Sequence, residues 1–311
     1  MSSHADHTTV IVGAGPAGLT AALGLARYRH PVTVVDSPRA PRNNASAGVH
    51  GHVGMDGVTP AEFRARAWKE LSRYATVERL EADAESVTPA PGGGFRVAVG
   101  GGTVEARTVL LATGVVDVLP ADVDGFAECW GRSVIHCPFC LGEENAGGRW
   151  ATVADNVELA GLSAVAFLAW SEDTIAICQE SMPGLETARA TARSSGGEVV
   201  TGTVRRLHHN QGALYAVELD DGRVLERETL VWTLRQRQQP VVRQAAEELK
   251  LTVDDAGFIG VDASQCTSVP GLYAAGDLTS RWKQSVTVSA AAGAAAADAI
   301  HMSALLGAVR R

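Results

Sequence analysis

The sequence predicts an α/β protein made of two Rossmann-like domains, each a three-layer ββα arrangement. Its 311 residues, of which 46% are hydrophobic and 20% charged, are enough for two domains of ordinary size. Short aliphatic runs near both ends and in the middle of the chain lead into turns and then into helix-like stretches. This succession of strand, turn and helix is typical of parallel sheets covered by helices.

The first of these runs leads into a glycine turn. A β-branched strand is followed by G-A-G-P-A-G at 13–18 and by an apolar helix-like stretch. Gly13 permits the tight bend, Gly15 lets the backbone approach a pyrophosphate, and Gly18 lets helix and strand pack closely. The next strand ends at Asp36, where a carboxylate can accept a hydrogen bond from a ribose hydroxyl. Together these features predict a dinucleotide site, for either FAD or NAD.

Two distant segments favour a flavin as the ligand. Residues 109–114 read V-L-L-A-T-G and residues 271–277 read G-L-Y-A-A-G-D, so each is a buried strand with a small-residue turn. Asp277 precedes an Ala-rich helix from about Val286, so it can bind a ribityl hydroxyl while the helix N-terminus faces the flavin or its phosphates. A loop rich in Gly, His and Asn at 41–57 is expected to lie beside the isoalloxazine ring.

The rest of the first half is predicted to be architectural. Residues 59–74 place Phe63, Ala67 and Leu71 on one face of a helix. Residues 87–109, broken by glycine-rich turns, are predicted to form a small antiparallel meander.

The C-x-x-C pair at Cys137 and Cys140 can close a disulfide that opens and recloses. Pro138 suits the first turn of a helix, so Cys137 is expected at a helix start, where unpaired N–H groups favour its thiolate. A zinc site is the alternative, but it would need a second pair of ligands at similar spacing. The remaining cysteines are isolated from one another: Cys129, Cys178 and Cys266. The pair therefore predicts redox chemistry and no metal.

The chain resembles the thioredoxin-reductase-like flavoproteins over nearly its full length. The motifs that carry this resemblance are the glycine turn, the A-T-G turn, the C-x-x-C pair and G-L-Y-A-A-G-D. The resemblance implies FAD as cofactor, bound by a domain split in sequence into residues 1–117 and 243–311. It implies that an NADPH-like domain, residues 118–242, is inserted between them and carries the C-x-x-C pair. The residues expected at the FAD are Gly13, Gly15, Pro16, Ala17, Gly18, Asp36, Ser37, Arg42, Asn44, Ala112, Thr113, Gly114, Gly276, Asp277, Gln284, Ser285 and Val286.

The inserted domain lacks the glycine turn that a nicotinamide cofactor needs. The strand and the helix are present, but the side chains of Asp155 and Asn156 stand where a pyrophosphate needs bare backbone. Asp155 and Glu158 also place negative charge against the anion. After the next strand, residues 179–181 offer no arginine cluster, although Glu180 could still accept from an unphosphorylated ribose. This domain is therefore expected to be degenerate, with its nicotinamide site lost.

Within the family, the closest resemblance is to the dithiol oxidases that close disulfides in gliotoxin, holomycin and related natural products. This resemblance implies a small-molecule dithiol as electron donor and O2 as acceptor, with a disulfide and hydrogen peroxide as products. It also implies that Cys137 is the exchange thiol that meets the substrate and that Cys140 is the thiol against the flavin.

The base that deprotonates the substrate is left open by the sequence. Related reductases usually have Asp directly after the second cysteine, and related oxidases often have His there, whereas this chain has Leu141. The nearby candidates are His136, Glu143 and Glu144. An imidazole titrates closer to neutrality than a carboxyl group, and acids in the first turns of a helix are favoured by its dipole alone. His136 and Glu143 are kept as the two candidate catalytic bases.

Two other functions remain open. One is a thiol-disulfide reductase for a protein such as thioredoxin, fed by ferredoxin or by an atypical NAD(P)H site. The other is a flavin-bound redox sensor whose disulfide switches a protein interface.

Composition narrows the partners and the location. A net charge of −8 and a pI near 5.6 disfavour nucleic acid and anionic membranes. Five cysteines fit a reducing cytoplasm better than a secreted disulfide framework. The N-terminus has no signal-peptide core, and the longest apolar run, 286–300, contains Asp298 and is too short for a membrane span. A cytoplasmic protein is expected, and the resemblance adds the expectation of a homodimer.

Overall fold

The computed structural model describes residues 8–309, and the side chains of residues 8–307. The chain divides into two compact units. Unit 1 comprises the chain up to Asn44, Gly48–Val116 and the chain from Gln236 onward, and unit 2 comprises Ala45–Ala47 and Asp117–Arg235. Each unit contains its own parallel sheet, which confirms the predicted α/β class.

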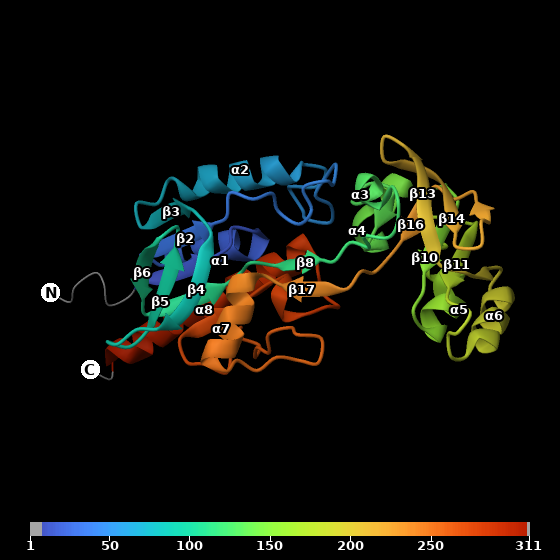
Figure 1. The fold of residues 1–311 in the computed structure, drawn as a ribbon. Helices are drawn as coiled ribbons and strands as arrows, with labels where there is room; N and C mark the ends of the chain where they lie inside the picture. The colour runs from blue at the N-terminus through green and yellow to red at the C-terminus, as the bar shows by residue number, and fades with distance from the viewer. Residues whose placement is uncertain (1–7, 310–311) are drawn as a thin grey trace. The chain divides into compact units, whose positions relative to one another are not determined.

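Unit 1 is built on a five-stranded parallel sheet with the order β18-β7-β1-β2-β3 (Figure 1). Its strands are β1 (Thr9–Val12), β2 (Val32–Asp36), β3 (Val77–Glu81), β7 (Thr108–Leu111) and β18 (Leu272–Ala274). Every residue of β1, β2 and β18 is buried, which explains why their sequences are mostly apolar. Because the strands are parallel, their carboxyl ends lie at one edge of the sheet.

The helices in the described part of unit 1 are α1 (Pro16–Arg27), α2 (Pro60–Leu71), α7 (Pro240–Leu249) and α8 (Val286–Val309), with a 3₁₀ turn η3 (Asp277–Thr279). α1 and α8 lie side by side (Figure 1). Their close approach depends on Gly293, where a Cβ would come within 2.1 Å of the Ala17 carbonyl oxygen. In α2, Thr59 caps the helix by accepting from the Glu62 N–H at 3.1 Å, and Pro60 takes the first position.

Helix α8 corrects the expectation that no apolar run is long enough to span a membrane. The run does not end near Ile300, because the helix continues, and Val286–Gly307 could cross a membrane by length and composition alone. In unit 1 this helix packs along α1 and contributes Ala296, Ala297 and Ile300 to the buried core around β1 and β2. A single helix of this kind is weak support for a membrane span, because core helices of globular domains meet the same criterion.

Two smaller sheets accompany the parallel sheet of unit 1. The predicted meander is confirmed as β4 (Ala84–Pro89), β5 (Phe95–Val99) and β6 (Gly102–Ala106). Strands β8 (Val115–Asp117) and β17 (Gln236–Gln238) pair with each other where the chain passes between the units (Figure 1). The chain re-enters unit 1 at Gln236, and α7 packs against β4 within that unit.

Unit 2 also has a five-stranded parallel sheet, with the order β12-β11-β10-β16-β9. Its strands are β9 (Val134–Ile135), β10 (Trp150–Val153), β11 (Thr174–Cys178), β12 (Glu198–Thr201) and β16 (Thr229–Val231). A separate antiparallel sheet consists of β13 (Val204–Asn210), β14 (Ala213–Leu219) and β15 (Val224–Leu225). The helical elements are α3 (Phe126–Cys129), α4 (Pro138–Leu141), η2 (Glu143–Asn145), α5 (Val157–Ala166) and α6 (Leu185–Ser194).

Candidate active site

The glycine turn of unit 1 lies against the carboxyl ends of the neighbouring strands. A Cβ on Gly13 would come within 2.5 Å of the Ala112 carbonyl oxygen, and Gly13 has a φ of 110°. A Cβ on Gly276 would lie 3.1 Å from Ala17, which starts helix α1 together with Pro16. The three segments that the sequence assigns to a cofactor are thus brought together at one edge of the sheet.

Gly15 and Gly18 are glycines for different reasons. A Cβ on Gly18 would lie 1.9 Å from the Gly13 carbonyl oxygen, so close packing requires glycine there. A Cβ on Gly15 would have no described protein atom within 4 Å, and Gly15 has an ordinary φ of −83°. The protein itself does not require glycine at position 15, so the space beside this residue is available to a ligand at the N-terminus of α1.

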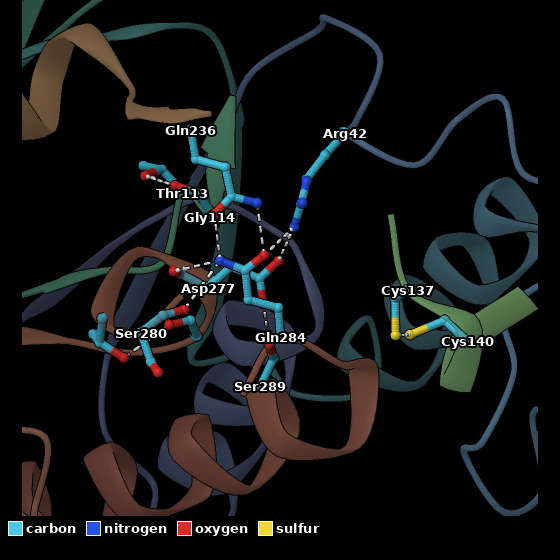
Figure 2. Close-up of polar contacts among 12 residues, drawn as sticks. Arg42, Thr113, Gly114, Cys137, Cys140, Gln236, Asp277, Ser280, Gln284 and Ser289 are labelled. Atoms are coloured by element: carbon cyan, nitrogen blue, oxygen red, sulfur yellow. Dashed lines mark hydrogen bonds and ion pairs between the residues drawn. The ribbon is translucent and has the colours of Figure 1, made fainter. Parts of the chain in front are cut away.

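Asp277 is fixed by a network of polar side chains (Figure 2). Arg42 Nη1 donates to Asp277 Oδ2 and to Gln284 Oε1, each at 2.9 Å, and Ser289 Oγ donates to Asp277 Oδ1 at 3.1 Å. Gln236 and Gln284 exchange amide hydrogen bonds of 2.9 and 2.8 Å. The side chains of Arg42 and Asp277 are only 12% and 19% exposed. The predicted residues Arg42, Asp277 and Gln284 therefore meet in one partly buried cluster.

Other predicted cofactor residues lie at neighbouring strand and helix ends. Gly114 has a φ of 62°, and its carbonyl oxygen accepts from Thr113 Oγ1 at 3.2 Å. Ser285 Oγ accepts from the Val288 N–H at 3.2 Å, so Ser285 caps the start of α8 at Val286.

Ser37 and Asn44 make other hydrogen bonds than those of the Asp277 network. Ser37 Oγ donates to Asp83 Oδ1 at 2.7 Å, and Arg39 pairs with the same carboxylate, whose pKa is lowered mainly by that arginine. Asn44 is exposed, and its backbone N–H donates to the Pro41 carbonyl oxygen. The structure thus gives these two predicted residues local partners.

In unit 2, the C-x-x-C pair follows the edge strand β9 and opens the short helix α4. Cys137 is the N-cap of this helix and Pro138 its first residue, so the predicted helix start is confirmed. The sulfur atoms of Cys137 and Cys140 are 2.7 Å apart as thiols (Figure 2). A disulfide bond is about 2.05 Å long, so only a small movement separates the thiol pair from the disulfide.

An aromatic cluster holds this helix in place. Trp150 is fully buried and stacks on Trp170 with ring centroids 5.9 Å apart, and Cys140 packs against the same cluster. Gly142 gives Trp170 room, because a Cβ there would lie 2.7 Å from the indole. Asn145 Nδ2 donates to the Leu141 carbonyl oxygen at 2.8 Å and ties the end of α4 to the following turn. The position of Cys140 is therefore set by buried packing.

The aromatic cluster extends to the surface beside the cysteines. Phe139, between the two cysteines, is 83% exposed, and its ring meets Trp170 edge to face at 5.6 Å. An exposed Phe held by a fixed Trp presents a rigid apolar face next to the thiols.

The candidate bases lie on both sides of the pair. His136 connects β9 to Cys137 and is partly exposed, with its ring 5.9 Å from that of Trp130. Glu143 and Glu144 are exposed in η2, directly after α4. The structure brings all three into the segment around the cysteines but does not single out one of them.

The turn between β10 and α5 is closed by its own side chains. Asn156 caps α5, because its Oδ1 accepts from the Leu159 N–H at 2.9 Å, while its Nδ2 donates to Asp155 Oδ1 at 2.8 Å. Glu158 lies in the first turn. A phosphate at this helix N-terminus would have to displace the Asn156 side chain and approach two carboxylates.

Comparison with known proteins identifies the family. The model of the pyridine nucleotide-disulphide oxidoreductases matches residues 7–153 and 185–295. The chain belongs to this family. It is 33% identical to thioredoxin reductase tcpT of Claviceps purpurea over 287 residues, covering 86% of this chain and 85% of that protein. It is 30% identical to thioredoxin reductase aclD of Aspergillus oryzae over 277 residues, covering 86% and 87%.

A solved structure agrees with this assignment. The crystal structure of HlmI is similar with a TM-score of 0.84 and 31% identity, covering 100% of this chain and 97% of that chain. The protein is thus a thioredoxin-reductase-like member of the pyridine nucleotide-disulphide oxidoreductases, with the predicted two-domain Rossmann fold. It is an oxidoreductase, and the prediction of FAD as its cofactor is confirmed.

The residues of unit 1 fit this cofactor. The space beside Gly15 suits a pyrophosphate at the N-terminus of α1, and Asp36 ends β2, where a carboxylate can accept from a ribose hydroxyl. The fixed carboxylate of Asp277 suits a hydroxyl of the ribityl chain.

Several residues in this oxidoreductase escaped sequence reasoning. Gln236 and Ser289 complete the Asp277 network, and Arg64 pairs with Asp36. Ser289 follows Val286 by one turn of the predicted helix, so it could have been found from helical spacing. Gln236 and Arg64 carry no such local signal, because their partners are distant in sequence.

Proposed function

We propose that this oxidoreductase is an FAD-dependent dithiol oxidase that closes a disulfide in a small-molecule dithiol. One dithiol and one O2 would give one cyclic disulfide and one hydrogen peroxide. The resemblance to the oxidases of gliotoxin- and holomycin-type natural products supports this reaction. We propose the same split as in the sequence interpretation, with an FAD domain and an inserted NADPH-like domain that has lost its nicotinamide site.

One observation carries the proposal. Unit 2 contains the C-x-x-C pair, but the turn before α5, where related proteins would bind a nicotinamide dinucleotide, is occupied by its own side chains. Cys137 and Cys140 have sulfurs 2.7 Å apart, as an exchangeable dithiol needs. In the same unit, Asn156 occupies the first-turn N–H of α5 that a nicotinamide dinucleotide would use. In this proposal a thiol takes the place of the nicotinamide and supplies electrons to the redox disulfide.

The cysteines would exchange thiols in two steps. A substrate thiolate attacks Cys137 Sγ in the Cys137–Cys140 disulfide, and Cys140 leaves as a thiolate. The second substrate thiol, losing its proton, attacks the substrate sulfur of the mixed disulfide and releases Cys137 as a thiolate. The substrate has then lost two electrons and two protons, and the cysteines hold the electron pair. When bound, FAD supplies the two-electron chemistry that passes this pair to O2.

A base beside Cys137 would prepare the substrate. We propose two candidates for this base. One is His136, which directly precedes Cys137 in the chain, and the other is Glu143, the first residue of η2. Either group would take the thiol proton, since only the thiolate attacks a disulfide.

The surface beside the thiols favours an apolar substrate. Phe139 and Trp170 offer a rigid aromatic face, whereas Glu143 and Glu144 add negative charge nearby. Glutathione, an anionic thiol, would be repelled by these carboxylates. We therefore propose a small, uncharged dithiol as the substrate. We also propose a homodimer, as the family resemblance implies, located in the cytoplasm, as the cysteine content favours.

Oxygen uptake with dithiothreitol, a small uncharged dithiol, tests this proposal. We expect one O2 consumed per dithiol oxidised, with half of that oxygen returned when catalase is added. Uptake should stay at background with glutathione. If dithiothreitol gave no uptake while ferredoxin or NADPH supported reduction of thioredoxin, the enzyme would be a reductase. If no donor sustained turnover although the disulfide formed and reopened, a sensor role would replace the enzyme.

A further inference from the structure

Asp36 is a carboxylate in an unusually buried position. It ends β2 and is 3% exposed, although carboxylates are almost never fully buried without a partner. Burial raises the pKa of Asp36, and the guanidinium groups of Arg64 and Arg79 oppose this rise. The Ala14 backbone N–H, in the glycine turn, also favours the ionised form. The charge state of Asp36 therefore depends on a few specific neighbours.

Arg64 is the closest of these neighbours. Its Nη2 lies 2.5 Å from Asp36 Oδ2, and its side chain is only 23% exposed on helix α2. Arg79, on β3, is 3.9 Å from the same oxygen and 3.1 Å from Glu81, so its charge is shared. Glu81 itself opposes ionisation of Asp36. Arg64 is thus the main counter-charge of the buried carboxylate.

The two arginines approach the carboxylate of Asp36 from the same side. Arg64 donates its hydrogen bond to Oδ2 of Asp36, and the ion pair with Arg79 is to the same oxygen. An ionised carboxylate oxygen accepts a hydroxyl hydrogen bond about twice as strongly as a neutral group does. Removing Arg64 would leave a buried negative charge that is relieved by taking up a proton.

We propose that Arg64 is a positioning residue for the adenosine half of FAD, because it holds Asp36 as an oriented carboxylate whose second oxygen accepts from a ribose hydroxyl. This role is independent of the substrate and of O2. It lies in unit 1 and connects helix α2, which the sequence marks as architectural, to cofactor binding.

The direction in which pH changes FAD affinity follows from the charge of the Asp36 carboxylate. The protonated form of Asp36 binds the ribose less well, and a lower pH favours that form. Without Arg64 the pKa of Asp36 rises further, so FAD affinity is lost earlier as the pH falls. A structural tether between α2 and β2 would not produce this pH dependence.

The rate of FAD release from the purified holoprotein tests the proposal, followed by the rise in flavin fluorescence at about pH 8 and about pH 6. At the higher pH, Arg64→Met should release FAD about tenfold faster than the wild type. At the lower pH, the ratio of the variant's release rate to the wild-type rate should be larger still. Arg64→Lys should restore most of the wild-type behaviour. The matched control is Arg66→Met, which removes an exposed i,i+4 partner of Glu62 on the same helix and should behave as wild type.

Release of FAD from Arg64→Met at the wild-type rate, or with the wild-type ratio between the two pH values, would overturn the proposal. If Arg64→Met does not fold, Asp36→Asn and the double variant Asp36→Asn/Arg64→Met still test it, because they leave no unpaired buried carboxylate. Arg64→Met should then add almost nothing to the effect of Asp36→Asn. A further, additive acceleration would contradict a role through Asp36.

Discussion

Replacing either cysteine of the C-x-x-C pair, as Cys137→Ser or Cys140→Ser, is expected to lower dithiol oxidation by roughly a thousandfold or more. Each change removes the disulfide that accepts the electron pair. The two variants should differ in accessibility. In Cys140→Ser, Cys137 at the N-cap of α4 should be trapped by substrate as a stable mixed disulfide, because no second sulfur can displace it. In Cys137→Ser, Cys140 should react more slowly, since it packs against the aromatic cluster of α4.

Mass spectrometry of the intact protein after incubation with substrate measures this difference. Cys266→Ser is the matched control, because Cys266 is also a partly buried thiol but lies in unit 1, where its backbone N–H donates to Asp262 Oδ1. It should retain wild-type activity. Substantial oxidation by either active-site variant would show that the pair is not the catalytic centre, and trapping only in Cys137→Ser would reverse the assigned roles.

Gly15→Glu is expected to weaken FAD binding strongly without disturbing the fold. Gly15 has an ordinary φ of −83°, and a Cβ there would meet no described protein atom within 4 Å. A carboxylate at this point would occupy the space beside the N-terminus of α1 and repel the pyrophosphate, which we expect to weaken FAD binding by roughly a hundredfold or more. The absorbance ratio of flavin to protein, with circular dichroism as a fold check, measures the effect.

Two other glycine variants sharpen this test. Gly92→Glu is the matched control, because Gly92 also has no described atom within 4 Å of a Cβ and belongs to unit 1. It should keep its flavin. Gly18→Val should lose FAD for another reason, since a Cβ would strike the Gly13 carbonyl oxygen and distort the turn itself. Full flavin occupancy in Gly15→Glu would show that this turn is not the dinucleotide site.

The features that sequence predicts well are those set by local rules. The glycine turn, the helix that begins after Thr59 and the helix start at Cys137 each depend on residues within a few positions, and all three occur where they were expected. The turn between β10 and α5 is local in the same way, and there Asn156 caps α5 with its own side chain. The loss of the nicotinamide site at this turn stays a prediction.

Features that depend on distant residues escaped prediction. The partner of Asp36 is Arg64 on another helix, and the partner of Gln284 is Gln236, which joins it only through folding. Nothing near either residue in the sequence marks these pairs. The length of α8 was also underestimated, because Asp298 looked like an interruption although an exposed helix face accepts it.

The central claim is that thiols, and not a nicotinamide, supply electrons to this protein. Anaerobic mixing of the oxidised holoprotein with dithiothreitol, NADPH or NADH, followed at the visible flavin absorbance, tests it most directly. Dithiothreitol should bleach the flavin, and should fail to do so in Cys137→Ser. NADPH and NADH should leave the absorbance unchanged on the timescale of turnover, because Asn156 and the carboxylates of Asp155 and Glu158 close the nucleotide turn. Rapid bleaching by either nicotinamide would contradict the account and make the protein a reductase.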